Sequence, residues 1–382
     1  MNKQEAVDTI KILQSLIDIG DASIILNTFI SAFNDKQIID SNGQVFLQGN
    51  FNVTGTKSTR MSSSKVNLQN LPSTGSRYAK IIKQCFQYCI NDEWIICGAD
   101  FSSLEAKINA LLTKDPEKLK IYIDGFDAHS FNAYHYWPDK FKNIKQIIPK
   151  TDADIKYNVE QINSIQHHPI YKKYRQDSKK VTFAAQYGGT SKTFVNSSGF
   201  TLKEAKKIEE NYHKLYVVSD QWAENRMREA AKVGYIDIAF GSRLRVPVLN
   251  QVIYGSTSVP YEALAEKRTA INASQQSYGM LNNRAAIELQ NRLFKTKHIY
   301  DIKPIAHIHD AQYFLVKRKP EVIKWLNDNL VKCMEWQELP EIKHDKVKLG
   351  GSLCIYHKTW NDEIELPKYT DLNTITNILN GL

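Results

Sequence analysis

The stretch WIICGADFSSLE, residues 94–105, places an acidic side chain at the end of an apolar run. Trp94 to Ala99 has the composition of a buried strand, and Ser102 to Leu112 has the pattern of a helix. Asp100 therefore lies at the C-terminal edge of the expected strand, a position that favours an exposed functional group. An aspartate at an ordinary strand-to-helix turn is the alternative, and this stretch alone does not separate the two.

Glu105 in the same stretch also has two interpretations. With Ser102 it forms the Ser-x-x-Glu pattern of a capping box, in which the glutamate side chain returns to the amide that begins the helix. It could instead be a functional carboxylate near Asp100. From the residues alone, the capping box is at least as well supported.

A second aspartate, Asp310, follows His309 at the turn of a hairpin pattern in IKPIAHIHDAQYFLV, residues 302–316. Turns favour aspartate for local hydrogen bonding, so this residue alone indicates little. Together, Asp100 and Asp310 could bridge a pair of divalent ions roughly 3.5–4 Å apart, the arrangement used for in-line phosphoryl displacement. Carboxylate oxygens suit Mg²⁺ or Mn²⁺ better than zinc.

A row of cations and aromatics occurs at steps of four in Arg175, Lys179, Phe183 and Tyr187, followed by Gly188. On a helix these side chains form one slowly spiralling row roughly 18 Å long. A nucleoside triphosphate has the same order, with charged phosphates at one end and a stacking base at the other. The alternative is an amphipathic helix that buries its aromatics and exposes its cations.

The remaining segments predict a strand-bearing unit with a helical insertion. We expect helices over 4–17 and 21–33, separated at Gly20–Asp21, then a hairpin or short strands over 44–53 and a loop over 54–72. From Asp115 to about Lys232 the chain is helical, polar and basic. A helix is expected over roughly 260–295. The two strand-borne aspartates lie on either side of an insertion of about 130 residues.

Composition excludes several classes of protein. The 382 residues are 42% hydrophobic with a net charge of +9, which is globular and mildly basic. Between Tyr171 and Lys180 five cations accompany one acid, a cluster that suits a polyanion or a solvated helix face. The five cysteines are scattered, which favours a reducing cytoplasm, and Cys85 and Cys89 lack a second pair for zinc. No signal peptide or uncharged apolar run of about 20 residues is evident.

Taken together, these motifs resemble those of family A (Pol I-like) DNA polymerases. The row from Arg175 to Gly188 resembles the fingers helix of that family, residues 100–105 resemble its first palm motif, and His309-Asp310 resembles the second. Other matching segments follow in the family's order over some 300 residues: Thr59-Arg60-Met61-Ser62-Ser63-Ser64, Asn67-Leu68-Gln69-Asn70-Leu71-Pro72, Phe240-Gly241-Ser242-Arg243, Arg268-x3-Asn272 and Gln276. So many motifs in the correct order make the resemblance specific.

The resemblance implies an α+β right-hand fold with an antiparallel-sheet palm, a helical fingers insertion and a truncated thumb. The corresponding ranges are 1–50 for a thumb remnant, 51–115 and 245–382 for the palm, and 116–244 for the fingers. It implies template-directed DNA synthesis by a two-metal mechanism, with two Mg²⁺ ions (Mn²⁺ as an alternative) held by Asp100 and Asp310. The implied partners are primer-template DNA and deoxynucleoside triphosphates.

The resemblance also assigns roles to individual side chains. Arg175, Lys179 and His129 are expected to contact the incoming triphosphate, and Lys179 to donate a proton to the pyrophosphate leaving group. Phe183 is expected to pack against the sugar and base, and Tyr187 to stack near the template base. Glu105 is expected to exclude a ribose 2′-hydroxyl. The residues expected to contact the primer-template minor groove are Arg60, Arg268, Asn272, Gln276 and His309.

Three departures qualify the resemblance. Ala311 stands where most relatives have glutamate, Ser103 replaces the usual glutamine, and Phe101 replaces a tyrosine. The His-Asp-Ala variant and the Gln275-Gln276-Ser277-Tyr278-Gly279 run are more similar to bacteriophage members, which implies the host cytoplasm as location. Only about fifty residues precede the palm-entry loop, and no proofreading acidic cluster is found.

We therefore expect no exonuclease activity in this chain. Either the chain is a piece of a longer polymerase, or it belongs to a split enzyme with a separate exonuclease–thumb subunit or a processivity factor as a partner. Two alternatives remain at this point. One is a non-catalytic or partner-dependent subunit that binds primed DNA, and the other is an RNA polymerase on the same scaffold.

Overall fold

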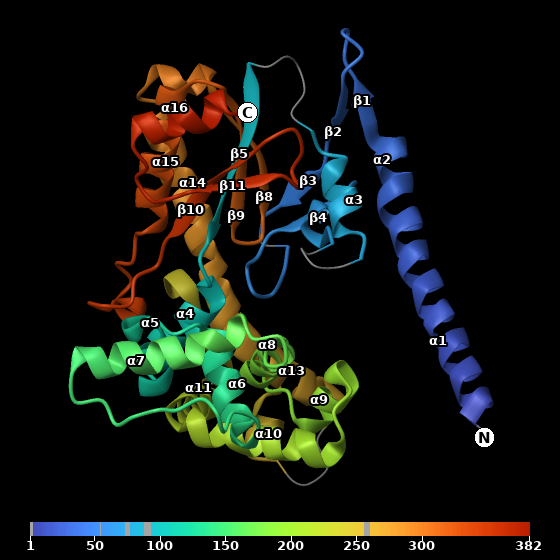
Figure 1. The fold of residues 1–382 in the computed structure, drawn as a ribbon, viewed down its shortest axis with the longest axis vertical. Coiled ribbons are helices and arrows are strands. Elements are labelled where there is room, and N and C mark those ends of the chain that lie inside the picture. Colours follow the sequence, from blue (N-terminus) through green and yellow to red (C-terminus); the bar gives the residue numbers. More distant parts are fainter. Residues whose placement is uncertain (1–2, 54, 73–76, 88–92, 256–259) are drawn as a thin grey trace.

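The computed structural model describes residues 3–53, 55–72, 77–87, 93–255 and 260–382. Figure 1 shows a sheet-bearing unit, a helical unit below it, and a long N-terminal helix that extends away from both. The sheet unit is built from both ends of the chain, and the helical unit comes from its middle. This is the arrangement of a strand-bearing unit with a helical insertion that the sequence predicts.

A five-stranded antiparallel sheet forms the centre of the upper unit, in the order β11-β10-β5-β9-β8. Its strands are β5 (Trp94–Phe101), β8 (Ile302–Ile308), β9 (Ala311–Lys317), β10 (Gly351–Tyr356) and β11 (Glu363–Leu366). The expected strand at Trp94 and the expected hairpin at 302–316 are both confirmed. In the register, Asp100 lies between Ala311 on β9 and Ser352 on β10.

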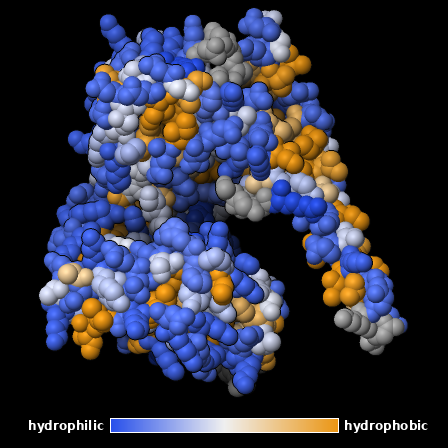
Figure 2. Space-filling model, in the orientation of Figure 1, coloured by the Kyte–Doolittle hydropathy of each residue, from blue (hydrophilic) through white to orange (hydrophobic). Residues whose placement is uncertain are grey.

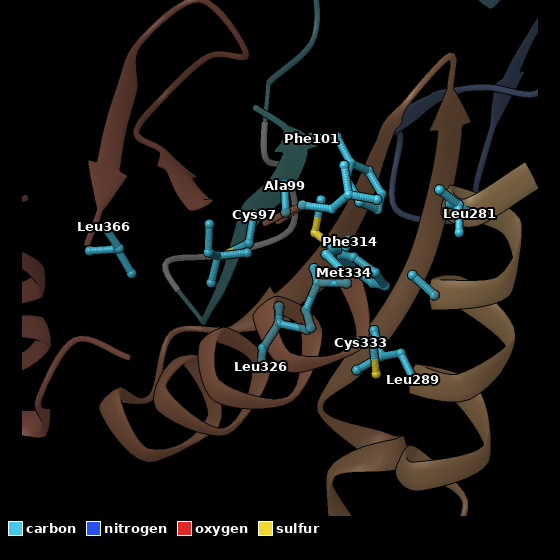
Figure 3. Close-up of a cluster of buried hydrophobic side chains, with 14 of the residues drawn as sticks. Cys97, Ala99, Phe101, Leu281, Leu289, Phe314, Leu326, Cys333, Met334 and Leu366 are labelled. Carbon is cyan, nitrogen blue, oxygen red and sulfur yellow. The ribbon is translucent and has the colours of Figure 1, made fainter. Parts of the chain in front are cut away.

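Side chains alternate between the two faces of the sheet along β5, and this alternation determines which face carries Asp100. Ile95, Cys97, Ala99 and Phe101 are at most 4% exposed and belong to the main hydrophobic core. Figure 3 shows Cys97, Ala99 and Phe101 packed with Phe314 and with residues of the covering helices. Because side chains alternate along a strand, Asp100 points to the opposite face. The core thus anchors the strand without enclosing its carboxylate.

Helices cover the core face of this sheet and link it to the rest of the chain. They are α14 (Met280–Leu293), α15 (Pro320–Met334) and α16 (Leu372–Asn380), with α4 (Leu104–Thr113) following β5 directly. The single helix expected over 260–295 is two helices, α13 (Tyr261–Gln276) and α14, joined by a 3-10 turn at Ser277–Gly279. Four further 3-10 turns, at Leu68–Asn70, Ala239–Gly241, Lys297–Tyr300 and Pro340–Ile342, connect elements around the sheet.

The helical unit follows α4 and begins at a buried aspartate. Asp115 accepts hydrogen bonds from the backbone amides of Glu117 (3.0 Å) and Lys118 (3.2 Å), which caps the first helix, and from Ser219 N (2.9 Å). The helices are α5 (Pro116–Asp124), α6 (Ala128–Tyr136), α7 (Asp152–Asn163), α8 (Lys172–Gln186), α9 (Ser191–Ser198), α10 (Leu202–Leu215) and α11 (Val217–Val233), with 3-10 turns at Pro138–Lys140 and Ser164–Gln166. The helical character expected from Asp115 to Lys232 is confirmed.

A small hairpin and a short helix lead back from this unit to α13. The strands β6 (Tyr235–Asp237) and β7 (Arg243–Arg245) pair antiparallel, and α12 (Asn250–Ile253) follows. The helix α13 packs against α11, α12 and α4. It therefore spans the junction between the helical unit and the sheet unit.

The N-terminal segment is one continuous helix where two were expected. It runs through α1 (Lys3–Ile24), a π-helical stretch at Ile25–Ile30, and α2 (Ser31–Lys36). Gly20 and Asp21 lie inside α1, so the predicted break between them is wrong. A glycine in a helix interior costs only about 1 kcal/mol relative to alanine, which is too little to end a helix whose other residues favour it.

This helix is also long and apolar. Gln4–Lys36 is the one helix in the described residues that could cross a membrane by length and composition, although core helices of other proteins meet the same criterion. Asp18 and Asp21 interrupt the apolar run of this helix. The helix meets the criterion because it continues through these two residues.

Short strands connect this helix to β5. β1 (Gln37–Ile39) and β2 (Val45–Leu47) form a hairpin around Asn42–Gly43, where Gly43 has a φ of 76°. β3 (Asn50–Asn52) pairs with β4 (Ser62–Ser64), which lies in the segment expected to be loop, and α3 (Ala79–Gln84) follows. Four cysteines, Cys85, Cys97, Cys333 and Cys354, are free thiols, and Cys89 lies outside the described residues.

Candidate active site

The two aspartates that the sequence singled out lie side by side at the edge of the sheet. Asp100 is the penultimate residue of β5, and Asp310 occupies the turn between β8 and β9. The backbone amide of Phe101 donates to the carbonyl oxygen of Asp310 at 3.3 Å, which ties the strand end to the turn. Burial and the neighbouring Asp310 raise the pKa of Asp100 to about 7, and burial raises the pKa of Asp310.

These two carboxylates fit a divalent cation. Asp100 is exposed at the surface of the sheet and Asp310 is half-buried, and partial burial together with the charge of Asp310 raises the pKa of Asp100. Paired carboxylate oxygens are the ligands that Mg²⁺ and Mn²⁺ prefer. No group of three or more His, Cys, Asp or Glu side chains that could hold a metal is found in the described residues. Ala311, opposite Asp100 in the register, adds no third carboxylate.

The turn that carries Asp310 is held by a buried amide. His309 has a φ of 53°, a left-handed conformation that costs energy for a residue with a Cβ. The Gln69 side chain accepts from His309 N at 2.9 Å and donates to His307 O at 2.7 Å. Asn282 donates to His307 Nε2 at 2.9 Å and to His309 O at 3.3 Å. The sequence motifs include Gln69 but gave no sign of this role, because its partners are about 240 residues away.

Glu105 faces the site and does not cap its helix. The N-cap of α4 is Ser103, which has a φ of 55° and makes no side-chain capping bond, so the capping-box interpretation is wrong. Glu105 instead forms an ion pair with Arg60 and accepts a hydrogen bond from Tyr187 OH at 2.7 Å. A hydrogen bond also links Gln276 to Tyr187. Four of the predicted site residues thus meet in one cluster.

The predicted row of cations and aromatics lies on α8. Arg175, Lys179 and Phe183 are on the helix, and Tyr187 is its C-cap. Lys179 is exposed and Phe183 is half-buried, as expected for groups that face a ligand site. Gly188, with a φ of 77°, turns the chain immediately afterwards, in a conformation that L residues with side chains rarely adopt. The cationic end of the row is the one further from Glu105.

Arg175 and His129 are joined through α6. The carboxylate of Asp127 accepts from Arg175 Nε and Nη2, both at 2.8 Å, and Ser178 Oγ donates to His129 O at 2.7 Å. Burial lowers the pKa of His129 to about 4, so the imidazole is neutral at pH 7. Its Nδ1 is buried and has no hydrogen-bond partner among the described residues. The three expected triphosphate contacts therefore come from two helices fastened to each other.

The expected minor-groove residues lie on three segments. Arg268, Asn272 and Gln276 follow one another at steps of four along α13, which places them on one side of that helix. Arg268 lies 5.9 Å from the ring centre of Tyr261. Arg60 and His309 come from the segment after β3 and from the β8–β9 turn. Gln276 of α13 is hydrogen-bonded to Tyr187, and Tyr187 is hydrogen-bonded to Glu105, which pairs with Arg60.

Comparison with known proteins identifies the family of this chain. The model of DNA polymerase family A matches residues 3–360, which is most of the chain. The chain belongs to DNA polymerase family A. The resemblance found in the motifs is thereby confirmed, while the bacteriophage type remains a prediction.

Individual relatives of this family A chain are distant. DNA polymerase I of Synechocystis is 24% identical over 327 residues, which cover 82% of this chain and 28% of the relative. DNA polymerase I of Geobacillus stearothermophilus is 25% identical, covering 82% and 31%. The thermostable DNA polymerase I of Thermus filiformis is 26% identical, covering 53% and 21%. The chain thus spans about a third or less of the length of these curated relatives.

A solved structure shows the same fold. The POL domain of Pol1 from M. smegmatis, in complex with DNA primer-template and dNTP, superimposes with a TM-score of 0.70 at 21% identity, covering 92% of this chain and 53% of that one. The right-hand polymerase fold, with its antiparallel sheet and helical insertion, is therefore confirmed. The domain boundaries and the residue roles proposed from the motifs remain predictions.

Proposed function

We propose that this family A chain performs template-directed DNA synthesis, transferring a nucleotidyl group from a deoxynucleoside triphosphate to a primer 3′-hydroxyl. The observation that carries the proposal is the site itself. Two neighbouring carboxylates lie at the end of β5 and in the β8–β9 turn, and a cationic helix row lies on the other side of the Glu105–Tyr187 cluster. A nucleoside triphosphate placed between them would have its phosphates beside the cations of the row and its base beside the aromatic side chains.

The site residues divide the work between metal binding, charge neutralisation and selection. Asp100 and Asp310 would hold two Mg²⁺ ions, which stabilise negative charge on the transferring phosphoryl group. Arg175, Lys179 and His129 bind the triphosphate, and Lys179 supplies a proton to the departing pyrophosphate. Glu105 is held by Arg60 and Tyr187, and its role is to exclude nucleotides that carry a ribose 2′-hydroxyl.

Primer extension with Mg²⁺ tests the proposal. Wild-type chain and Asp100→Ala are compared on a primed template with four deoxynucleotides, at equal concentration and with folding checked by circular dichroism. Extension by wild type and its loss in the variant are expected. Equal extension by both chains would remove the metal assignment. Retention of a mismatched primer end is also expected, because we propose no proofreading activity in this chain.

The same assay separates the two alternative functions. An RNA polymerase would extend the primer with ribonucleotides in preference to deoxynucleotides. That is the opposite of the selection proposed for Glu105. A non-catalytic subunit would bind primed DNA in a salt-dependent manner and not extend it, because phosphate contacts release counterions. The two aspartates, Lys179 and Arg175 all occupy the site, which favours catalysis.

A separate partner subunit is part of the proposal because the N-terminal helix leaves apolar surface exposed. Ile10, Leu13, Ile17 and Ile24 are between 54% and 65% exposed and recur at steps of three, four and seven. Figure 2 shows hydrophobic residues along this helix, away from the body of the molecule. Asp18, on another side of the helix, pairs with Arg77 at 2.6 Å.

We propose that an exonuclease–thumb subunit covers this apolar side with a helix of its own. Solvent-facing apolar stripes of this length are typical of interaction sites, and i, i+3, i+4, i+7 spacing is the pattern that packs against another helix. The polypeptide encoded upstream is the candidate, and its addition should stimulate extension by wild type but not by Leu13→Asp. Stimulation of both chains would contradict the docking site. Sedimentation of the chain alone shows whether a second copy occupies the surface.

A further inference from the structure

The contact between Asp127 and Arg175 is the best-defined ion pair in the helical unit. Both oxygens of the carboxylate are used, one by Nε and the other by Nη2, at 2.8 Å each. The side chains are 20% and 24% exposed, so the pair is shielded from water. Bidentate pairs of this kind fix the plane of the guanidinium as well as its position.

Asp127 is itself fixed by the start of α6. Its Oδ2 accepts from Ser130 N at 2.8 Å as the N-cap of the helix, and its own amide donates to Asn163 Oδ1 at 2.7 Å. Burial raises the pKa of Asp127, but hydrogen bonds from Arg175 and Ser130 outweigh this and hold the pKa at about 2. The carboxylate is therefore charged at every working pH.

The geometry of the pair leaves part of Arg175 available. A guanidinium has five N–H donors, and Asp127 takes one from Nε and one from Nη2. Within the described residues Nη1 makes no hydrogen bond, so the edge that carries it can donate to an anion. An arginine held along one edge loses less side-chain entropy when it binds a phosphate along the other. Without the pair, the long side chain of Arg175 would have to be ordered by the ligand itself.

We propose that Asp127 is a positioning residue for the triphosphate end of the site: it holds Arg175 from α8 against the start of α6, where His129 lies two residues away. This rests on the proposed function, because the triphosphate contacts of Arg175 and His129 are part of it. The Ser178–His129 hydrogen bond adds a second tie between the same two helices. Asp127 does not touch the substrate and acts through its neighbours.

Asp127→Asn separates this role from that of a helix cap. Asparagine caps helices as well as aspartate does, so the variant keeps the start of α6 while it removes the charge and one acceptor that Arg175 uses. The matched control is Asp371→Asn, the N-cap of α16, whose carboxylate accepts from Thr374 N at 3.0 Å and has no arginine partner. Asp371→Asn should melt close to wild type, and Asp127→Asn should melt lower because the ion pair with Arg175 is lost, so circular dichroism is used to check that both variants are folded at the assay temperature.

Two measurements are made on each chain. Equilibrium binding of dATP to the DNA-free protein, followed by calorimetry, does not depend on catalysis. We expect Asp127→Asn to weaken it about fivefold to tenfold, a range typical of a lost preorganised charge contact. In primer extension, KM for dATP should rise by a similar factor while kcat and the Kd for primed DNA stay near wild type. Asp371→Asn should change none of these.

A double-mutant cycle with Arg175→Ala completes the test. If Asp127 acts through Arg175, then Asp127→Asn has no further effect on dATP binding in the Arg175→Ala background. Additive effects, or an unchanged dATP affinity in the single variant, would overturn the positioning role. Absence of extension by wild type together with a normal binding cycle would count against the proposed function and leave the role of Asp127 standing.

Discussion

The carboxylate end of the site and its cationic end are built in different ways. Asp100 lies on a hydrogen-bonded strand and Asp310 in the turn beside it, and the other face of their sheet packs on the main core of the molecule. Arg175, Lys179 and Phe183 lie on α8, a helix in a separate unit with smaller hydrophobic clusters of its own. One end is part of a sheet, and the other depends on side-chain contacts between helices.

This difference indicates which end is preformed. The strand ends cannot separate without breaking backbone pairing, and the Asp310 turn is additionally held by Gln69 and Asn282. At the helical end, Lys179 is exposed and Arg175 is held by a single carboxylate. We infer that the sheet end sets the position of the reaction and that the helical end adjusts to the triphosphate. The predictions that follow test this contrast, beginning with the largest effect.

Removing a carboxylate at the sheet end should abolish synthesis without harming the fold. We expect Asp100→Ala or Asp310→Ala to lower the extension rate at least about 1,000-fold, since charge stabilisation in the transition state is usually the largest catalytic contribution. Because the charge of Asp310 disfavours ionised Asp100, neither variant should melt below wild type. Single-turnover extension and thermal melts provide the measurement, with exposed Asp345→Ala as the control. A variant that unfolded would show that the aspartates also stabilise the sheet.

At the helical end, Lys179 and Lys180 form a natural pair for comparison. Both are exposed on α8, but only Lys179 belongs to the row with Arg175 and Phe183. As a proton donor, Lys179 should contribute about 100-fold to kcat, so Lys179→Ala should lose that factor and Lys180→Ala should change little. Equal losses in the two variants would mean that general positive charge, and no single donor, serves the triphosphate.

Much of this contrast could be predicted from the sequence. The apolar run before Asp100 and the apolar residues flanking His309-Asp310 indicated strands, and steps of four indicated the row on α8. These signals are local, since each depends on residues within a few positions of one another. The continuous helix through Gly20 was missed for the same reason, because glycine and aspartate mark a boundary by propensity while the apolar residues on both sides continue the helix.

Contacts across long stretches of chain could not be predicted. Gln69 meets His309 about 240 positions away, and Asp127 meets Arg175 across 48 positions. Glu105 is the clearest example of a wrong local prediction. Its local pattern favoured a capping box, while its partners in the structure are Arg60 and Tyr187. A local pattern indicates what a side chain can do, and only tertiary structure shows which partner it has.

Glu105 lies between the two ends and tests whether they are coupled. Glu105 pairs with Arg60 and Tyr187, and its proposed role is to exclude a ribose 2′-hydroxyl. Glu105→Ala should reduce the preference for deoxynucleotides over ribonucleotides about 100-fold, within the range that shape discrimination supplies. Competing incorporation of dATP and ATP gives the ratio, and Glu321→Ala, in the exposed first turn of α15, is the control. Unchanged discrimination would mean that Glu105 only orients Tyr187.

Gln69 tests whether the sheet end owes its position to the amide that clamps it. Gln69→Met keeps the volume but leaves His309 N and His307 O without their side-chain partners. An unpaired buried polar group costs about 1–3 kcal/mol, so the free energy of unfolding should fall by that order. The extension rate should drop about tenfold, because a displaced ligand turn disturbs alignment. Urea unfolding and single-turnover rates check both, with exposed Gln251→Met as the control.

His129 provides the smallest effect and the only one that depends on pH. Its pKa is lowered by burial to about 4 in the folded chain, below the ordinary value of 6.5. Between these values the unfolded chain binds more protons, so the contribution of His129 lowers stability as pH falls from 6.5 towards 4. Since other groups also titrate, the measured quantity is the difference between wild type and His129→Gln. That difference should change by about 2 kcal/mol between pH 7 and pH 5.

Addition of dATP should shrink that difference. A triphosphate beside His129 favours the protonated imidazole and raises its pKa, which brings the folded value closer to the unfolded one. Urea unfolding at pH 5 and pH 7, with and without dATP, gives the four values needed for each chain. A dATP-independent slope would place His129 away from the phosphates. In that case Arg175 and Lys179 alone form the cationic end, and the adjustable part of the site is confined to α8.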